Sequence, residues 1–403
     1  QKISLKESSA EGGIGKVVKE GGSRALFNKT LGGFKWSLWE GAHAYKIGDY
    51  YYLMIIGSYG SWFRREVCYR SKKLYDSKAS DWEAQLIFEG STYEYGTGIA
   101  QGGIVDTIYG DWYGFLFQDH DGLGRVPSIL AVNWDYVDTK NNKYYPDWPM
   151  MGYYDDKGNF VNCLGTSQKV KNPLTIQLNK SDKENYIVGD DDFSYPDFKE
   201  GDSLKKVWQW NHNPDDANWS VTENPGYYRI KNGKVAGNIW FARNSLTQRT
   251  VGPNFTSETC VLTENMKPGD YAGLAAISAH YGMVGVKCDE NGNRYVFQGC
   301  NSDTNSGAKA KKEDKIKENA VSKEKIEAPV YLKIEYAFNT GKTRADRANF
   351  FYSLDGENWK SIGKTFSLGF DTATTFMGTR SWLVNYATKE AGGYVDFDYY
   401  KVK

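Results

Sequence analysis

The sequence predicts an all-β protein divided into two domains, and three observations carry this prediction. Its 403 residues exceed what one ordinary hydrophobic core holds, which favours two domains of about 150 to 230 residues each. Aromatic residues make up 15% of the chain, and this richness in Tyr and Trp is typical of β-rich folds. Short aromatic or β-branched runs alternate with turn residues, and no long helical periodicity appears.

The first domain is predicted from six such runs that follow Trp36. They cover 50–56, 66–70, 85–89, 103–107, 112–117 and 129–133. The next stretch is polar, has no periodicity and ends at Pro173, so we place a linker at 166–173. The predicted domains are therefore 1–165 and 174–403.

The second domain is predicted to be a two-sheet β-sandwich, because about ten strands fall within about 230 residues. The runs are 207–210, 227–230, 257–262, 271–278, 282–287, 294–298, 330–338, 348–353 and 393–402. One segment differs from them. Residues 308–328 are rich in Lys and Glu without a broad apolar stripe, which predicts a solvated loop or a short surface helix.

Charge and composition limit the classes of partner. Lys plus Arg and Asp plus Glu both number 50, so the formal net charge is zero and there is no long-range field to attract nucleic acid or an anionic membrane. No apolar run approaches the roughly 18 residues of a membrane span. Abundant aromatic rings can stack on the flat apolar faces of sugars. The composition thus favours a neutral partner such as a carbohydrate.

The five cysteines do not form a recognisable framework. Their number is odd, their spacing is irregular and no CxxC occurs, so neither a zinc site nor a complete set of disulfides is predicted. Cys288 and Cys300 flank a turn at 291–293 and could face each other across a hairpin. We favour free thiols.

The segment around Glu40 is the sharpest chemical signal. Glu40 lies just before a predicted strand and hairpin, among Trp36, Trp39 and Tyr45. Burial among aromatic side chains would raise the pKa of Glu40, and a general acid needs such a pKa to hold its proton near neutral pH. The alternative is a solvated carboxylate in a loop.

A second segment brings further polar groups near strand ends. Gln101 lies in a Gly-rich stretch, while His120 and Arg125 follow the aromatic run that begins at Trp112. These long polar side chains could line one shared pocket. The alternative is that His120 is a hydrogen-bonded structural histidine and Arg125 a surface cation.

These segments resemble glycoside hydrolase family 43. The run EGAHAYKIGDYYYL is similar to the motif around the general acid of that family, and GIAQGGIVDT with GDWYGFLFQDH and LGRVP resembles a later blade of its propeller. The second half is similar to the accessory domain of the β-xylosidase-like members through QWNHNPD, LTQRTVGP, GDYAGLAA and NYATKEAGGYVDFDYY. The segments occur in the order of the family and cover most of residues 36–403.

The resemblance implies a fold and an activity. The expected fold is a five-bladed β-propeller, of which this chain holds the C-terminal blades, followed by a concanavalin-like β-sandwich. The expected activity is inverting hydrolysis that releases terminal β-D-xylosyl or α-L-arabinofuranosyl units from plant cell-wall polysaccharide fragments. For such a protein from a bacterium, an extracellular or periplasmic location is expected.

The resemblance also implies roles for individual residues. Glu40 would be the general acid, with Trp39 beside it at the sugar, and Arg125 would contact the hydroxyl groups of the sugar that is released. His120 would lie in the axial cavity, where such propellers often hold water or calcium. Many relatives have His where this chain has Gln101, so calcium would need oxygen ligands here.

Two further expectations concern the second domain. Phe376 would close the sugar pocket from the sandwich side, although a place in the sandwich core is an equal alternative. Asp396 and Asp398 lie in the last predicted strand, where alternation would point both to one face. We expect plain exposure there ahead of a structural calcium site.

The sequence departs from the family in one respect. Inversion needs a second carboxylate as general base, which the family supplies as an Asp before the acid. The 39 residues before Glu40 contain no Asp, and residues 1–165 supply only about three blades. We therefore expect the base outside this chain, for example on a separate N-terminal propeller fragment, with Asp119 as the one internal candidate. The competing interpretation is a non-catalytic carbohydrate-binding protein derived from such an enzyme.

Overall fold

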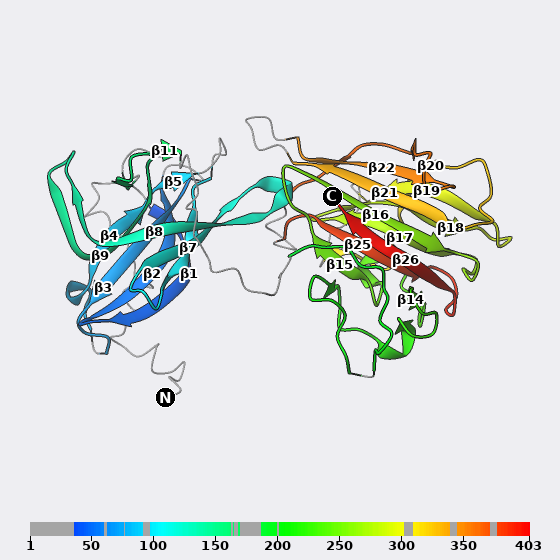
Figure 1. The fold of residues 1–403 in the computed structure, drawn as a ribbon, viewed down its shortest axis with the longest axis horizontal. Helices are drawn as coiled ribbons and strands as arrows, with labels where there is room; N and C mark the ends of the chain where they lie inside the picture. The colour runs from blue at the N-terminus through cyan, green and yellow to red at the C-terminus, as the bar shows by residue number, and fades with distance from the viewer. Residues whose placement is uncertain are drawn as a thin grey trace. The chain divides into compact units, whose positions relative to one another are not determined.

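The structure, a computed structural model, forms two compact units (Figure 1). It describes residues 36–59, 63–75, 77–91, 97–162, 164, 168–169, 187–199, 201–301, 309–338, 345–370 and 377–403. The first unit comprises Gln1–Asp119, Arg125–Asn179 and Thr340–Lys342, and the second unit comprises His120–Gly124, Lys180–Asn339 and Thr343–Lys403. Apart from single turns of 3-10 helix, the regular elements of these described residues are strands. The predicted all-β class is confirmed.

The first unit contains two antiparallel sheets of the size of propeller blades. The four-stranded sheet follows chain order with β1 (Trp36–Ile47), β2 (Tyr50–Tyr59), β3 (Arg64–Ser71) and β4 (Glu83–Phe88). The five-stranded sheet has the order β10 (Phe160–Val161), β9 (Lys143–Tyr154), β8 (Arg125–Asp138), β7 (Trp112–Asp119) and β6 (Ala100–Asp106). A short parallel pair joins β5 (Gly90–Ser91) to β11 (Gln168–Lys169). Where about three blades were expected in residues 1–165, the described residues form two sheets of this size.

The core of the first unit lies between these two sheets. Met54 and Cys68 from the four-stranded sheet pack in one cluster with Leu116 and Met150 from the five-stranded sheet. Because successive side chains of a strand point to opposite faces, the neighbours of Met54 form a second cluster with Val67 on the other face. The four-stranded sheet is therefore buried on both faces, as a blade between neighbours would be.

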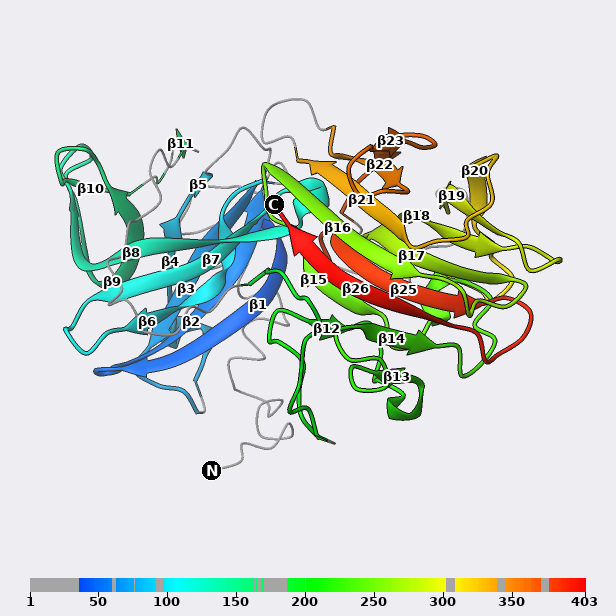
Figure 2. The ribbon, with the colours of Figure 1, turned by 45° about the vertical axis from the view of Figure 1, so that its right-hand side comes forward.

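The second unit is a sandwich of two larger antiparallel sheets (Figure 2). The seven-stranded sheet has the order β12 (Gln209–Trp210), β15 (Leu246–Arg249), β25 (Arg380–Ala387), β17 (Asp270–Ile277), β18 (Tyr281–Cys288), β19 (Arg294–Cys300) and β20 (Lys317–Val321). The other sheet has the order β13 (Trp219–Ser220), β14 (Tyr228–Lys231), β26 (Tyr394–Val402), β16 (Asn254–Leu262), β21 (Val330–Ala337), β22 (Arg347–Ser353) and β23 (Lys360–Ser361), with β24 (Phe366–Ser367) also paired to β22.

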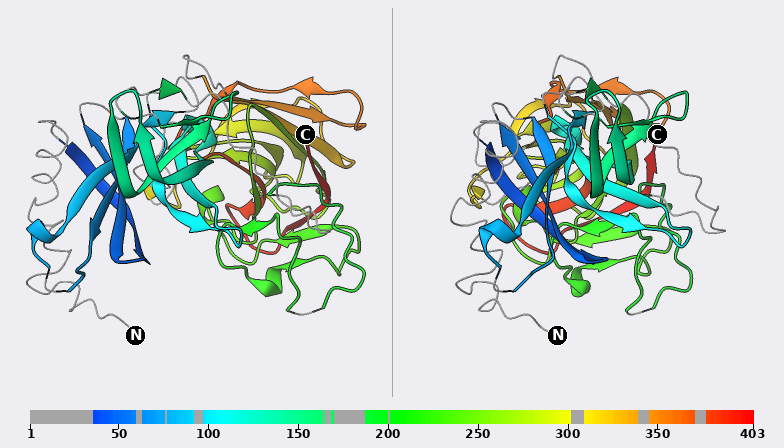
Figure 3. Two further views of the ribbon diagram at one scale, coloured as in Figure 1. Left: turned by 60° about the vertical axis from the view of Figure 1, so that its left-hand side comes forward. Right: turned by 90° about the vertical axis from the view of Figure 1, so that its left-hand side faces the viewer.

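The main core of the second unit lies between its two sheets. Figure 3 shows the strands of these sheets from two further directions. Strand β21 alternates strictly between buried and half-buried residues, so that Leu332 and Ile334 face the core. They share one cluster with Leu274 and Leu383 of the opposite sheet. A smaller cluster around Trp240 covers the outer face of the seven-stranded sheet. The predicted sandwich is confirmed.

Several strands were not expected from the sequence. Strand β1 contains Glu40, which was expected just before a strand, and β20 lies inside the Lys- and Glu-rich segment that was expected to be a loop or helix. Strands β9 and β25 also fall outside the runs that were predicted from the sequence. The linker predicted at 166–173 stays a prediction, since only β11 is described within it.

The cysteines agree with the free-thiol interpretation. Cys68, Cys260 and Cys288 are free thiols, and Cys163 lies outside the described residues. In the β18–β19 hairpin Cys288 pairs with Arg294 and Cys300 pairs with Gly282, so the two thiols lie at opposite ends. No helix among the described residues is long and apolar enough to cross a membrane.

Candidate active site

Glu40 is placed by two irregularities in β1. It pairs with Ile56, and the register of β1 shifts both before and after this pair. Gly41, the next residue, has φ +68°, a left-handed conformation that Gly adopts without a Cβ penalty. The carboxylate is exposed. The burial expected for Glu40 is therefore wrong for the described residues, because the bulged strand presents its side chain outward.

Gln101 packs directly over this bulge. A Cβ added to Gly41 would overlap the Gln101 side chain, so the amide lies against the Gly41 backbone. Gln101 itself has φ +65°, which is uncommon for a residue with a side chain. Its backbone N–H donates a hydrogen bond of 2.7 Å to Oε2 of Glu66. The four-stranded sheet thus holds Gln101 beside Glu40.

Glu66 is a buried carboxyl that sequence reasoning missed. It is 0% exposed, and burial raises its pKa to about 8, so it holds a proton at neutral pH. Its Oε2 accepts the hydrogen bond from Gln101, while Oε1 has no hydrogen-bond partner among the described residues. Within the run REVCYRS, Glu66 occupies a position that looks like the polar face of an ordinary strand. Only the packing of the neighbouring sheet reveals its burial.

Two guanidinium groups face Glu40. Arg64 and Arg125 both interact electrostatically with Glu40, and burial lowers the pKa of each guanidinium without removing its charge. Asp119 forms ion pairs with both arginines, the one with Arg125 at 3.5 Å. The Arg125 guanidinium carbon also lies 4.4 Å from the centroid of the Phe117 ring. Arg125 is thereby held near Glu40 with its side chain 31% exposed.

All of these groups lie at one end of the strands of the first unit. Register pairs Glu40 with Ile56 and Ile56 with Glu66 in the four-stranded sheet. In the five-stranded sheet Asp119 pairs with Arg125 across the ends of β7 and β8. The hydrogen bond from Gln101 to Glu66 and the ion pair of Arg64 with Asp119 connect the two sheets there. Of the predicted site residues, Glu40, Gln101 and Arg125 are brought together.

His120 belongs to the second unit, so its place relative to those three residues stays a prediction. It is 1% exposed, and burial lowers its pKa to about 4, so the imidazole is neutral at pH 7. Its backbone N–H donates to the carbonyl of Gly124 in a tight turn. Its predicted role at the sugar site stays a prediction.

Two predicted site residues cannot be placed. The backbone of Trp39 lies in β1, but its side chain falls outside the described residues, and Phe376 falls outside them altogether. Calcium also stays a prediction. In the described parts of the chain no group of three or more His, Cys, Asp or Glu side chains could hold a metal ion. We therefore derive no chemical step from a metal.

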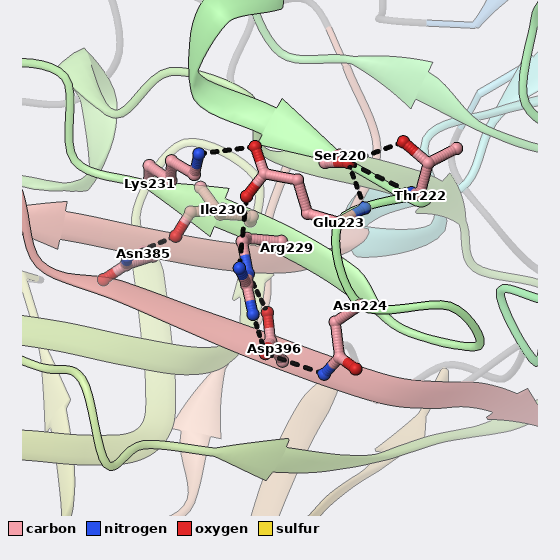
Figure 4. Close-up of polar contacts among 9 residues, drawn as sticks. All are labelled: Ser220, Thr222, Glu223, Asn224, Arg229, Ile230, Lys231, Asn385 and Asp396. Carbon is pink, nitrogen blue, oxygen red and sulfur yellow. Dashed lines mark hydrogen bonds and ion pairs between the residues drawn. The ribbon is translucent and has the colours of Figure 1, made fainter. Parts of the chain in front are cut away.

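Asp396 differs from its predicted exposure. It is 5% exposed and accepts two hydrogen bonds of 2.7 Å from Arg229 and one of 3.0 Å from Asn224 (Figure 4). Asp398 is only partly buried, and the register of β26 shifts next to it, between its pairs at Phe397 and Tyr399. The predicted exposure of Asp396 is wrong, because Arg229 of β14 lies directly opposite it and pairs with its carboxylate.

The first unit carries an exposed carboxylate, Glu40, at the ends of two blade-like sheets, and the second unit is a two-sheet sandwich. The model of the family "Beta xylosidase C-terminal Concanavalin A-like domain" matches residues 196–403, just over half of the chain. The chain therefore belongs to glycoside hydrolase family 43.

Relatives and solved structures agree with this assignment. A beta-xylosidase from Formosa agariphila is 27% identical in an alignment of 364 positions that covers 84% of this chain and 52% of that protein. The structure of a bifunctional GH43-CE protein from Bacteroides eggerthii has a TM-score of 0.72 and 34% identity over 93% of this chain and 42% of its own. A xylan beta-1,4-xylosidase from Bacillus halodurans C-125 shares the fold, with a TM-score of 0.65 and 19% identity over 91% of this chain and 65% of its own. The chain thus spans about half the length of the curated relative.

Proposed function

We propose that this chain carries the general-acid side of a glycosidase active site, with Glu40 as the proton donor to the leaving glycosidic oxygen. The observation that carries the proposal is the convergence of Glu40, Gln101 and Arg125 at one end of the strands. Arg125 can donate charge-assisted hydrogen bonds to sugar hydroxyls from its fixed place on Phe117. Gln101 packs over the Gly41 backbone and so fixes the bulge that presents Glu40.

The proposed reaction is a single inverting displacement. Glu40 gives its proton to the leaving oxygen while a second carboxylate takes a proton from water on the opposite face of the sugar, about 6.5 to 9.5 Å away. Asp119, the internal candidate for this base, is 7% exposed and forms ion pairs with Arg64 and Arg125. It is not offered to a water molecule. We therefore place the base on polypeptide outside these 403 residues.

The proposed substrate is a terminal β-D-xylosyl or α-L-arabinofuranosyl unit of plant polysaccharide fragments, in an extracellular or periplasmic setting. Relatives named beta-xylosidase support a pentose. The neutral formal charge of the chain suits an uncharged sugar.

The role of Glu40 is tested by Glu40→Gln in an assembly that is catalytically complete. Hydrolysis of xylobiose should fall by orders of magnitude, whereas nitrophenyl xyloside should suffer less because its leaving group needs less protonation. Glu83→Gln, on the same sheet with its side chain 62% exposed, is the matched control and should retain activity on both substrates. Equal loss on both substrates in Glu40→Gln would contradict the acid role.

A second candidate is a carbohydrate-binding protein without turnover, and the ion-paired state of Asp119 favours it. The two candidates differ when an N-terminal blade segment bearing the family Asp is supplied in trans to residues 1–403. Turnover of nitrophenyl xyloside that appears only with that segment supports the enzyme. Binding of xylobiose that never leads to turnover supports the binding protein.

A further inference from the structure

A pocket opens in the first unit, away from Glu40. It has a volume of about 380 Å³ and lies within the range of about 300 to 1,000 Å³ that small-molecule sites occupy. It is lined by residues from five strands and their turns. The residues that carry the argument are Asp49, Tyr50, Lys72, Trp112, Trp134 and Asp147.

This pocket lies at the opposite end of the strands from Glu40. On β1 its lining begins at Ile47, seven residues beyond Glu40, which corresponds to about 20 Å along an extended strand. Trp112 begins β7, whereas Asp119, which ends that strand, lies at the Glu40 end. A ligand bound in this pocket therefore does not reach Glu40, the proposed proton donor.

Aromatic rings dominate the wall of the pocket. Trp112 and Trp134 meet edge to face with ring centroids 5.3 Å apart, and Tyr52 meets Trp134 at 5.5 Å. Each of the two Trp side chains is only partly buried, so apolar ring surface stays open to a ligand. Such rings bind the C–H faces of sugars through dispersion and burial of apolar area.

Charged groups of both signs complete the wall. Asp49 and Lys72 lie 3.6 Å apart with side chains 82% and 63% exposed, so hydroxyl groups of a ligand can reach both. Asp147 is exposed and has φ +56°, and its carbonyl accepts hydrogen bonds of 2.9 Å from the Tyr52 hydroxyl and from Arg70. These bonds hold its backbone in a conformation that a residue with a side chain rarely adopts. Two carboxylates against one ammonium disfavour an anionic ligand.

We propose that this pocket is a non-catalytic binding site for one neutral sugar unit of a polysaccharide chain. Aromatic faces would hold the ring, Asp49 and Asp147 would accept hydrogen bonds from its hydroxyls, and Lys72 would donate one. Binding there would keep the protein on a polymer while the Glu40 end is free for a chain terminus. The proposal does not depend on turnover at Glu40.

The test measures binding of xylohexaose by titration calorimetry to the full chain and to variants. Asp49→Ala with Lys72→Ala changes only exposed side chains and should weaken binding at one site about tenfold. Trp112→Ala should weaken it further. Tyr154→Ala removes a ring that is 52% exposed elsewhere in the first unit and should leave binding unchanged. Glu40→Gln should retain binding in this pocket, which separates the result from the proposed activity.

A crystal soaked with xylohexaose gives the direct readout. Sugar density stacked beside Trp112 supports the proposal, including in the Glu40→Gln protein. Unchanged affinity in the Asp49→Ala, Lys72→Ala double variant together with unchanged affinity in folded Trp112→Ala overturns it. An equal loss in Tyr154→Ala also overturns it, because the effect would then not belong to this pocket.

Discussion

Asp396 in the second unit and Glu66 in the first unit are both buried carboxyl groups, but they differ in how fully they are hydrogen-bonded. In the second unit both oxygens of Asp396 accept hydrogen bonds, from Arg229 and Asn224, and this partner raises the pKa of Arg229 above its ordinary value. In the first unit, the described part of the chain offers a donor to one oxygen of Glu66 alone, and burial raises the pKa of Glu66 to about 8.

This difference in hydrogen bonding distinguishes a buried carboxylate that stabilises the fold from one that belongs to a candidate site. The ion pair of Asp396 with Arg229 joins the strands β14 and β26, and this structural role accounts for its burial. A carboxyl that is buried with one oxygen unsatisfied costs stability. Glu66 accepts a hydrogen bond from the Gln101 backbone, and Gln101 packs against Gly41, the residue after Glu40. The unfavourable burial of Glu66 is therefore consistent with a role in positioning the candidate site.

The largest effect is expected from breaking the paired group. Arg229→Leu leaves Asp396 buried without its cation, which should lower the free energy of unfolding by about 3 to 5 kcal/mol. Lys231→Met, which removes a more exposed cation bound to Glu223, is the control and should cost less than about 1 kcal/mol. Urea unfolding measures both. Similar small losses in the two variants would show that the Arg229 pair is not structural.

Arg125→Ala should affect function and spare stability. In the complete assembly, the variant loses its hydrogen bonds to the sugar. The resulting fall in kcat/KM should correspond to a loss of about 2 to 4 kcal/mol of transition-state stabilisation. The melting temperature should change little, because Arg64 still pairs with Asp119. An unfolded variant whose remaining folded fraction has normal activity would make Arg125 a structural residue.

Glu66 should give the first unit a pH-dependent stability. Its pKa is about 8 in the folded state and near 4.5 when unfolded, so between these values the folded state binds the extra proton. Stability therefore falls as pH rises through this window, by about 2 to 3 kcal/mol from pH 5 to pH 7. Glu66→Gln should flatten this slope.

The measurement for Glu66 has to be local, because burial also raises the pKa of Asp270 in the second unit to about 6. Hydrogen exchange of peptides from β3, corrected for the intrinsic effect of pH, reports on the first unit alone. Glu83→Gln on β4 should keep the wild-type slope. A Glu66→Gln protein with that same slope would contradict the assignment.

The sequence predicted regular elements well and irregular ones poorly. Alternation located β21 and the sandwich, because burial of one face dictates a period of two. It failed for β1, where Gly41 and two register shifts break the period, and for β9, where two prolines interrupt the strand and no run was predicted. These same irregularities place Glu40 at one end of the first unit and Asp147 at the other.

The candidate site was predictable only in part for a related reason. Motifs identified Glu40, Gln101 and Arg125, which the structure brings to one end of the strands. Glu66 and Arg64 come from an adjacent strand whose sequence carries no motif, and only the contact between two sheets reveals them. Residues that act through long-range packing leave no local pattern.

The smallest effect tests whether Gln101 fixes the Glu40 bulge. Gly41 and Gly48 both have positive φ, so Ala at either position should cost about 1 to 2 kcal/mol of strain. A Cβ at Gly48 would meet nothing within 4 Å, whereas one at Gly41 would overlap the Gln101 side chain. Gly48→Ala is therefore the matched control for strain without overlap.

A double-mutant cycle isolates this overlap. Gly41→Ala should cost more than Gly48→Ala, and adding Gln101→Ala should recover about 1 kcal/mol in the Gly41→Ala background, because the overlap is gone while the strain stays. Gln101→Ala should recover nothing in the Gly48→Ala background. Urea unfolding of the six proteins, wild type included, gives both coupling energies. Equal coupling at the two glycines would mean that Gln101 does not rest on the bulge, and the proposed positioning of Glu40 by Gln101 would fail with it.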